Sequence, residues 1–423
     1  MKKGAVAGGI VSLTAVIGYL IFIAHAVIST SLGHRNKELT YFKRSHEVLH
    51  KFDHERMSSL NIGTPKLSTN TYHDTIENDP NRDYTYLGTR ENATLLMLVR
   101  NWELDGALKS MRSLEDRFNR KYHYDWTFLN DVPFDDAFIE ATSAMASGKT
   151  SYGLIPSSDW DRPSSIDDEK FESSLQLMQE KGVIYGGSKS YRNMCRFNSG
   201  FFFRQKLLDQ YRYYFRVEPD VEYYCDFPFD PFRVMREQRK IYGFVISMYE
   251  YEDTIPTLWD AVEEFMADNP DIVDLETNSY DFIIDDSMIG TEMPIIQSNS
   301  MYNLCHFWSN FEIGDLSFFR SERYLRYFEH LDRKGGFYLE RWGDAPVHSI
   351  AVALLLRQDE VIHFDELGYY HIPFGTCPTA HNIMLQQRCA CDPGADSNID
   401  IKAHSCLNRW WKMGGGKYFM KHG

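Results

Sequence analysis

Two short acidic segments of this chain have the residue types and spacing that hold a divalent cation. They are Asp159-Trp160-Asp161 and Glu218-Pro219-Asp220. In each segment, two carboxylates are separated by a single residue. Carboxylates bind Mg²⁺ or Mn²⁺ together with phosphate oxygens, and such a cation neutralises the charge that develops on a departing diphosphate. Either segment could therefore serve group transfer from a nucleotide diphosphate.

The surrounding residues favour the second segment. Residues 213–217 form an apolar run typical of a strand that leads directly into Glu218, and Pro219 stiffens the turn that follows. Asp159 and Asp161 lie between serines and an Arg-Pro pair, in a stretch typical of a polar surface loop. We therefore predict that the metal site lies at Glu218, and we interpret Asp159 and Asp161 as solvated loop residues.

The elements that would position these side chains alternate between strands and helices, which predicts βαβ units and a sheet with parallel strands. Such sheets bind ligands at the carboxyl ends of their strands. Arg100-Asn101 and Asn130-Asp131 each follow a predicted strand, so they are candidate nucleotide contacts, although each pair is also typical of an ordinary turn. We expect strands at 95–99, 125–129, 152–155, 213–217 and 243–248, and helices at 103–122, 134–146, 170–182, 231–239, 256–267 and 320–334. We expect loop structure over 269–300.

The N-terminus predicts a membrane anchor. Residues 5–24 carry no charge, and about 20 helical residues span a hydrocarbon core of ~30 Å. A cleaved signal peptide is the alternative, since Ala24-His25-Ala26 resembles a cleavage site, but the apolar part of a signal peptide is only about 7–15 residues long. The short basic head favours a cytoplasmic N-terminus. The predicted organisation is a cytoplasmic head at 1–4, a transmembrane anchor at 5–28, a polar stem at 29–80, a lumenal catalytic domain at 81–408 and a basic tail at 409–423.

Composition narrows the function further. A net charge of −15 argues against a nucleic-acid partner, which needs a basic surface. The hydrophobic content of 43% supports a folded core. There are 7 cysteines, so at least one is unpaired within the chain, and a secretory compartment would allow disulfides among the others. Aromatic residues make up 15%, which suits stacking on sugar rings but is equally typical of a core.

Several stretches mix aromatic residues with Asn, Arg, His and carboxylates, a combination that suits a sugar pocket. The segments RFNSGFFF, FRVEPDVEYYCD, YNLCHFWSNFEI and ERWGDAPVHSIA resemble, in this order, the fungal α-1,2-mannosyltransferases of glycosyltransferase family 15. The likeness covers roughly residues 80–380. It implies a GT-A-like α/β fold with a mixed sheet, a nucleotide-binding N-terminal half, Mn²⁺ as cofactor, GDP-mannose as donor and a place in the Golgi membrane.

The same resemblance implies roles for individual residues. Glu218 and His371 would bind the metal ion. Glu312 would be the nucleophile, or else a buried carboxylate that holds its loop. Tyr191 would lie near the reacting carbon, or else pack in the core. The remaining expected donor-binding residues are Arg100, Arg196, Asp220 and Asp344.

The function expected from these residues is retaining α-1,2 transfer of mannose from GDP-mannose to a mannosylated glycoprotein. Retention would proceed by double displacement through Glu312, or by a front-face reaction in which Tyr191 orients the acceptor hydroxyl. Mannosylphosphate transfer and a catalytically silent lumenal glycan-binding protein are the alternatives. The joint presence of Glu218, His371, Tyr191 and Glu312 favours an enzyme. A glycosidase is a weaker alternative, since a nucleotide-type sheet would have no purpose in it.

Overall fold

The computed structural model describes residues 90–284 and 298–415. The expected head, anchor and stem at 1–80 lie outside these residues, as do most of the acidic loop at 283–299 and the end of the tail from residue 416. Within the described ranges, no helix has the length and apolar character needed to cross a membrane. The predicted anchor therefore stays a prediction.

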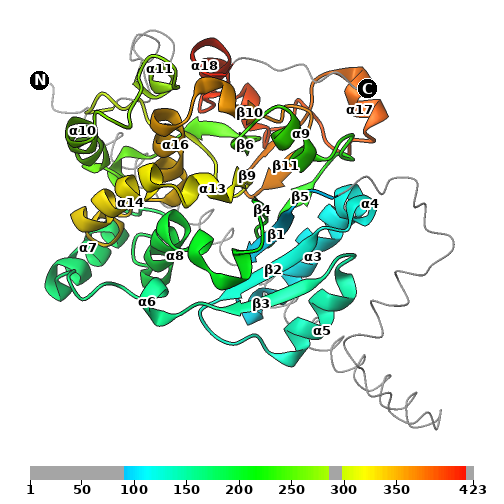
Figure 1. The fold of residues 1–423 in the computed structure, drawn as a ribbon, viewed down its shortest axis with the longest axis horizontal. Helices are drawn as coiled ribbons and strands as arrows, with labels where there is room; N and C mark the ends of the chain where they lie inside the picture. Colours follow the sequence, from blue (N-terminus) through cyan, green and yellow to red (C-terminus); the bar gives the residue numbers. More distant parts are fainter. Residues whose placement is uncertain (1–89, 285–297, 416–423) are drawn as a thin grey trace, which may run out of the picture. The chain divides into compact units, whose positions relative to one another are not determined.

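A mixed sheet lies at the centre of the described chain (Figure 1). Its strand order is β10-β6-β9-β4-β1-β2-β3. Neighbouring strands are parallel from β4 to β3, whereas β9 runs antiparallel to both β4 and β6. The predicted α/β class with a mixed sheet is confirmed. The strands are β1 (Ala93–Leu98), β2 (Asp125–Asn130), β3 (Thr150–Leu154), β4 (Tyr213–Arg216), β6 (Tyr242–Phe244), β9 (Glu312–Asp315) and β10 (Val361–His363).

Helices pack on both faces of this sheet (Figure 1). Many begin at a side chain that accepts a backbone N–H; Asp135, Asp167 and Ser188 do so at α5, α7 and α8. The longer helices are α3 (Leu104–Leu114), α5 (Asp136–Met145), α7 (Asp168–Glu180), α8 (Lys189–Gly200), α9 (Pro231–Glu237), α10 (Leu258–Asp268), α14 (Glu322–Lys334), α16 (Asp344–Leu355) and α18 (Leu407–Met413). The shorter ones are α4 (Arg120–Tyr122), α6 (Ser157–Trp160), α11 (Tyr280–Ile284), α13 (Leu316–Phe319), α15 (Gly336–Leu339) and α17 (His381–Gln386).

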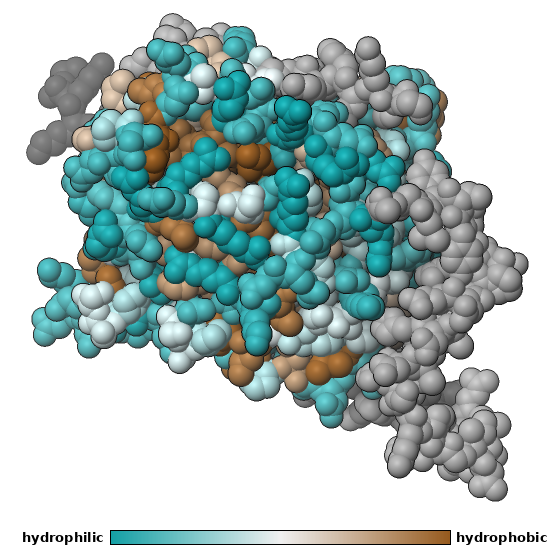
Figure 2. Space-filling model, viewed as in Figure 1, coloured by the Kyte–Doolittle hydropathy of each residue, from teal (hydrophilic) through white to brown (hydrophobic). Residues whose placement is uncertain are grey.

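The hydrophobic core forms two clusters, one on each face of the central sheet, because side chains alternate in direction along each strand. In β1, Leu96 contributes to one cluster, whereas Leu95 and Met97 contribute to the other, because successive strand side chains point to opposite faces. The first cluster contains side chains of α8, α10, α14 and α16, and the second those of α3, α5 and α9. In Figure 2, hydrophilic side chains cover much of the visible face, with hydrophobic ones between them.

Three expectations about local structure were wrong. The single strand expected at 243–248 is divided, because β6 pairs within the central sheet while β7 (Ser247–Tyr249) pairs with β8 (Cys305–Phe307) in a separate small sheet. The loop expected at 269–300 contains α11. The polar loop expected around Asp159 is the short helix α6, in which the Trp160 side chain is buried.

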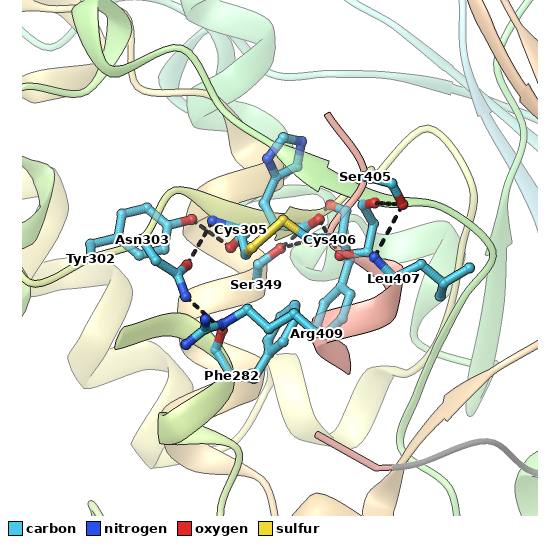
Figure 3. Close-up of a disulfide and its surroundings, with 12 residues drawn as sticks. Phe282, Tyr302, Asn303, Cys305, Ser349, Ser405, Cys406, Leu407 and Arg409 are labelled. Atoms are coloured by element: carbon cyan, nitrogen blue, oxygen red, sulfur yellow. Dashed lines mark hydrogen bonds between the residues drawn. A yellow bond between two sulfur atoms is a disulfide. The ribbon is translucent and has the colours of Figure 1, made fainter. Parts of the chain in front are cut away.

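Disulfides fix the C-terminal part of the described chain. Cys305 and Cys406 join β8 to the residue before α18, and Arg409 Nε donates to the carbonyl of Phe282 at 2.7 Å (Figure 3). The first residues of the unassigned tail thus form a helix, in which Trp410 is fully buried. Cys225–Cys389 and Cys377–Cys391 are the other bonds, and Cys195 is free and buried, as the odd cysteine count predicts.

Candidate active site

One edge of the central sheet brings together several of the predicted site residues. The parallel strands β1, β2 and β4 end at this edge, and the antiparallel strand β9 begins there. Phe215 pairs with Ile313, so Arg216 at the end of β4 lies beside Glu312 at the start of β9. This arrangement explains why segments almost a hundred residues apart in sequence meet at one place.

Arg216 lies at the centre of a buried group of carboxylates. Its Nε is 2.6 Å from Oε1 of Glu218, and its Nη1 is 2.5 Å from Oδ2 of Asp344 and 4.0 Å from Oε1 of Glu312. Burial alone would lower the pKa of the Arg216 guanidinium, but the charges of Glu218, Asp344 and Glu312 raise this pKa well above its usual value. The guanidinium therefore stays charged and fixes the orientation of the Glu218 carboxylate.

The sequence interpretation missed Arg216. The sequence does indicate a special role for this residue. An arginine inside the otherwise apolar run Tyr213–Val217 is unusual, and a buried guanidinium needs a charged partner.

Asp344 is the first residue of α16 and is buried. Besides the contact with Arg216, its Oδ2 accepts a hydrogen bond from Oγ of Ser309 at 2.8 Å. Burial would raise the pKa of Asp344, but the charges of Arg216 and His348 and the two hydrogen bonds outweigh it and hold this pKa below its usual value. Asp344 is thus a carboxylate that positions Arg216.

Glu312 is 1% exposed and surrounded by donors. The hydroxyl of Tyr214 donates to Oε1 at 2.8 Å, the hydroxyl of Tyr242 donates to Oε2 at 2.9 Å, and Nδ1 of His348 lies 3.0 Å from Oε2. The carboxylate lines a small cavity with Leu96, Leu98, Asn198, Phe202, Tyr214 and Arg216. Glu312 is thus a buried, hydrogen-bonded carboxylate, and it also borders the cavity beside Arg216.

The contacts of His348 define where a proton lies. Its Nε2 is 3.0 Å from the carbonyl oxygen of Asn198, which only accepts, so Nε2 carries a hydrogen. Its Nδ1 faces Glu312. A hydrogen bond there needs one proton, either on the imidazole or on the carboxyl group. His348 thus connects Glu312 on β9 to the backbone of α8.

Tyr191 lies on α8, and its ring stacks on that of Tyr185 with 4.7 Å between centroids and 14° between planes. The guanidinium of Arg341 is 5.2 Å from the Tyr191 ring centroid. Burial, together with the neighbouring Cys195 thiol, raises the pKa of Tyr191 well above its usual value despite Arg341. Tyr191 is therefore a neutral phenol that can orient a hydroxyl group.

Arg100, just past the carboxyl end of β1, connects three segments of the chain. Its Nη1 is 2.9 Å from Oδ1 of Asp131, its Nη2 donates to Oγ of Ser190 at 2.9 Å, and its guanidinium lies 5.0 Å from the ring centroid of Trp160. The two strand-end pairs chosen from sequence thus contact each other through Arg100 and Asp131.

Glu218 and His371 each present a group of the kind that binds a divalent cation. The Glu218 side chain is 18% exposed, and Arg216 contacts its Oε1. Nδ1 of His371 is 2.8 Å from the carbonyl oxygen of Ile372 and so donates to it, which leaves the Nε2 lone pair for a ligand bond. His371 ends β11 (Tyr369–His371), which pairs with β5 (Glu222–Tyr223), just beyond Glu218.

The described ranges contain no group of three or more His, Cys, Asp or Glu side chains that could hold a metal ion. A cation at Glu218 and His371 would therefore need oxygen ligands from a diphosphate, as Mg²⁺ and Mn²⁺ commonly do.

Asp220 and Arg196, two further expected donor-binding residues, form ion pairs with other side chains. Asp220 is 63% exposed and pairs with Nζ of Lys109 at 3.2 Å. Arg196 forms a two-point ion pair with Asp332, at 2.7 and 2.8 Å, and its guanidinium lies 4.5 Å from the Phe201 ring centroid. This ion pair joins α8 to α14, so the structure does not bring Arg196 together with Arg216.

Comparisons with known proteins identify the family of this chain. A family model described as glycolipid 2-alpha-mannosyltransferase matches residues 44–415. The chain is 65% identical to the probable mannosyltransferase KTR2 of Saccharomyces cerevisiae over 90% of this chain and 89% of that protein. It is 48% identical to the alpha-1,2 mannosyltransferase KTR1 of the same yeast, over 78% of this chain and 80% of that protein.

A solved structure shows the same fold. It is core-mannan synthase A from Aspergillus fumigatus in its Mn/GDP form, with a TM-score of 0.72 and 40% identity, covering 78% of this chain and 87% of that one. The mannosyltransferase Ktr4p of S. cerevisiae in complex with GDP also has a TM-score of 0.72, with 36% identity over 77% of this chain and 82% of that one. The chain therefore belongs to the glycolipid 2-alpha-mannosyltransferase family of glycosyltransferases.

Proposed function

We propose that this glycosyltransferase moves mannose from GDP-mannose to a mannose residue of a glycoprotein, in α-1,2 linkage and with retention at the anomeric carbon. The observation that carries the proposal is that Arg216 orients the Glu218 carboxylate, while His371 keeps its Nε2 available for a ligand. A relative named as an alpha-1,2 mannosyltransferase and the related GDP and Mn/GDP structures support this choice.

Mn²⁺ fits the Glu218 and His371 positions, where it would neutralise the charge of the departing diphosphate. Arg100, held by Asp131 and Ser190, would bind the donor on the nucleotide side of a GT-A-like fold. Arg216 would keep the Glu218 carboxylate in place while Asp344 fixes Arg216. These charged side chains would thus form a fixed binding site for the leaving diphosphate.

The contacts of Glu312 and Tyr191 favour the front-face route. Two tyrosine hydroxyls donate to Glu312, Nδ1 of His348 lies 3.0 Å from it, and the side chain is almost fully buried, which limits its reach as a nucleophile. The neutral Tyr191 phenol would orient the acceptor hydroxyl, whose proton would pass to the departing phosphate. Retention follows because the acceptor enters on the face that the phosphate leaves.

The test uses the full-length chain in detergent with GDP-mannose, methyl α-mannoside and Mn²⁺. We expect NMR to identify an α-1,2-linked dimannoside, and we expect chelator or Glu218→Ala to abolish most transfer. Asp159→Ala is a matched carboxylate control and should remain active. Equal turnover in chelator would reject the metal role, and a phosphodiester product would show mannosylphosphate transfer instead. Binding of mannosides without any turnover would indicate a silent glycan-binding protein.

We also propose that residues 5–28 anchor the protein as a single-pass type II protein of the Golgi membrane, with the catalytic domain in the lumen. The uncharged run and the short basic head support this orientation. A C-terminal tag that protease digests in intact Golgi vesicles, without detergent, would contradict it.

A further inference from the structure

Tyr185 combines features that core packing does not explain. It lies in the loop between α7 and α8, its φ is 58°, and it is 61% exposed. A left-handed backbone is unfavourable for a residue with a bulky side chain, and glycine would adopt it at no steric cost. Such a residue is retained where the site needs its side chain.

The loop that holds Tyr185 is tightly built. The amide of Gly186 donates to the carbonyl of Val183 at 2.9 Å, and the amide of Ser188 donates to the carbonyl of Tyr185 at 3.0 Å. A side chain at Gly186 would meet the backbone of Met178 at 2.7 Å, so this loop packs directly on the end of α7. The Tyr185 ring is therefore presented from a fixed backbone.

The exposed ring lies next to the reaction centre. Tyr185 stacks on Tyr191. The Cys195 side chain interacts with both the Tyr191 hydroxyl and the backbone of Asp344, so this buried cysteine lies between the two residues. Asp344 contacts Arg216, which contacts Glu218. A continuous series of neighbours thus leads from the exposed Tyr185 ring to the proposed metal ligand.

We propose that Tyr185 is the platform on which a pyranose ring of the acceptor mannoside stacks. The inference rests on the proposed mannosyl transfer and adds the residue that selects the acceptor. A tyrosine ring offers an apolar face for the C–H groups of a sugar, and a ring held by its backbone and by Tyr191 loses little freedom on binding. One occupant, the acceptor sugar, explains the ring's exposure, its strained backbone and its position beside Tyr191.

The test compares Tyr185→Gly, Tyr185→Ala and Tyr185→Trp in the full-length protein, with methyl α-mannoside as acceptor. Tyr185→Gly relieves the strained backbone, so we expect an unchanged or higher unfolding midpoint. It also removes the ring, so the KM for the acceptor should rise about tenfold, the factor expected for a lost stacking contact. GDP affinity and the KM for GDP-mannose should stay unchanged. Tyr185→Trp should keep the acceptor KM low.

Arg239→Gly is the matched control. Arg239 also has a positive φ, of 55°, and is exposed, but it follows α9 instead of bordering Tyr191. The Arg239→Gly variant should leave the KM for the acceptor and the KM for GDP-mannose unchanged. An unchanged acceptor KM in active Tyr185→Gly and Tyr185→Ala variants would overturn the inference alone. If the wild-type protein transfers no mannose to methyl α-mannoside, the proposed function fails and the inference fails with it.

Discussion

Nη1 of Arg216 lies 2.5 Å from Oδ2 of Asp344, although the two residues are 128 positions apart in sequence. This ion pair joins the end of β4 to the first turn of α16, and both side chains are buried. Because the same guanidinium contacts Glu218, the ion pair connects the packing of the C-terminal half with the orientation of the proposed metal ligand.

We expect Arg216→Lys to lower kcat/KM by about a hundredfold or more, because one ammonium cannot hold Glu218 and Asp344 in the two-armed geometry of a guanidinium. The free energy of unfolding should fall by about 3 kcal/mol, since buried carboxylates lose a partner. Steady-state kinetics and urea denaturation measure the two effects. Arg112→Lys, in an exposed pair with Asp116, is the control. Near-normal kinetics in Arg216→Lys would refute the positioning role.

Glu218→Gln should raise the Mn²⁺ concentration needed for half-maximal activity and reduce kcat strongly, because the neutral amide is a poor ligand for a hard cation. Asp220→Asn should cost less than about tenfold, since this side chain is mostly exposed and pairs with Lys109. Titration of activity with Mn²⁺ for both variants measures the difference. Equal losses would show that both carboxylates bind the ion.

Glu312→Gln should keep measurable activity, reduced by about 10- to 100-fold. The amide can donate to Nδ1 of a neutral His348, so a hydrogen bond between these two side chains can persist. His348→Ala should be more destabilising, because it removes the side-chain partner of the buried Asn198 carbonyl and one of the polar partners of Glu312. Kinetics and thermal unfolding of both variants provide the test. Trapping of a mannosyl group on Glu312, detected by mass spectrometry, would establish double displacement instead.

Asp400→Asn should stabilise the protein at pH 7. Burial raises the pKa of Asp400 to about 6, even though the Thr376 hydroxyl donates to its carboxylate. The folded state therefore binds a proton more tightly than the unfolded state, and stability falls as pH rises from about 4 to about 6. The substitution removes this loss, worth up to about 3 kcal/mol at pH 7, and should give little gain at pH 4.

Denaturation of Asp400→Asn at both pH values measures this effect. Asp396→Asn is a matched control in the same loop, where the carboxylate is fully exposed and pairs with Lys402. It should show no pH-dependent gain. A similar gain for Asp400→Asn at pH 4 and pH 7 would exclude titration as its cause.

Local patterns in the sequence determined most of the N-terminal half. The strands β1 and β2 and the capped helices α5 and α7 can be recognised from local sequence patterns alone. Each was predicted within a few residues. The position of Glu218 directly after a strand was readable for the same reason. The family resemblance supplied His371, Tyr191 and Glu312, whose roles the spacing alone did not indicate.

Tertiary structure decided how these residues act. The antiparallel insertion of β9 places Glu312 beside Arg216, and the return of α16 places Asp344 on the same guanidinium. The expected donor contact Arg196 is committed to Asp332, and the strand expected at 243–248 is divided between two sheets. Periodicity records which face of an element is buried, but not which distant side chain it meets there. The charge pairings that define the site are set by contacts between segments far apart in the chain.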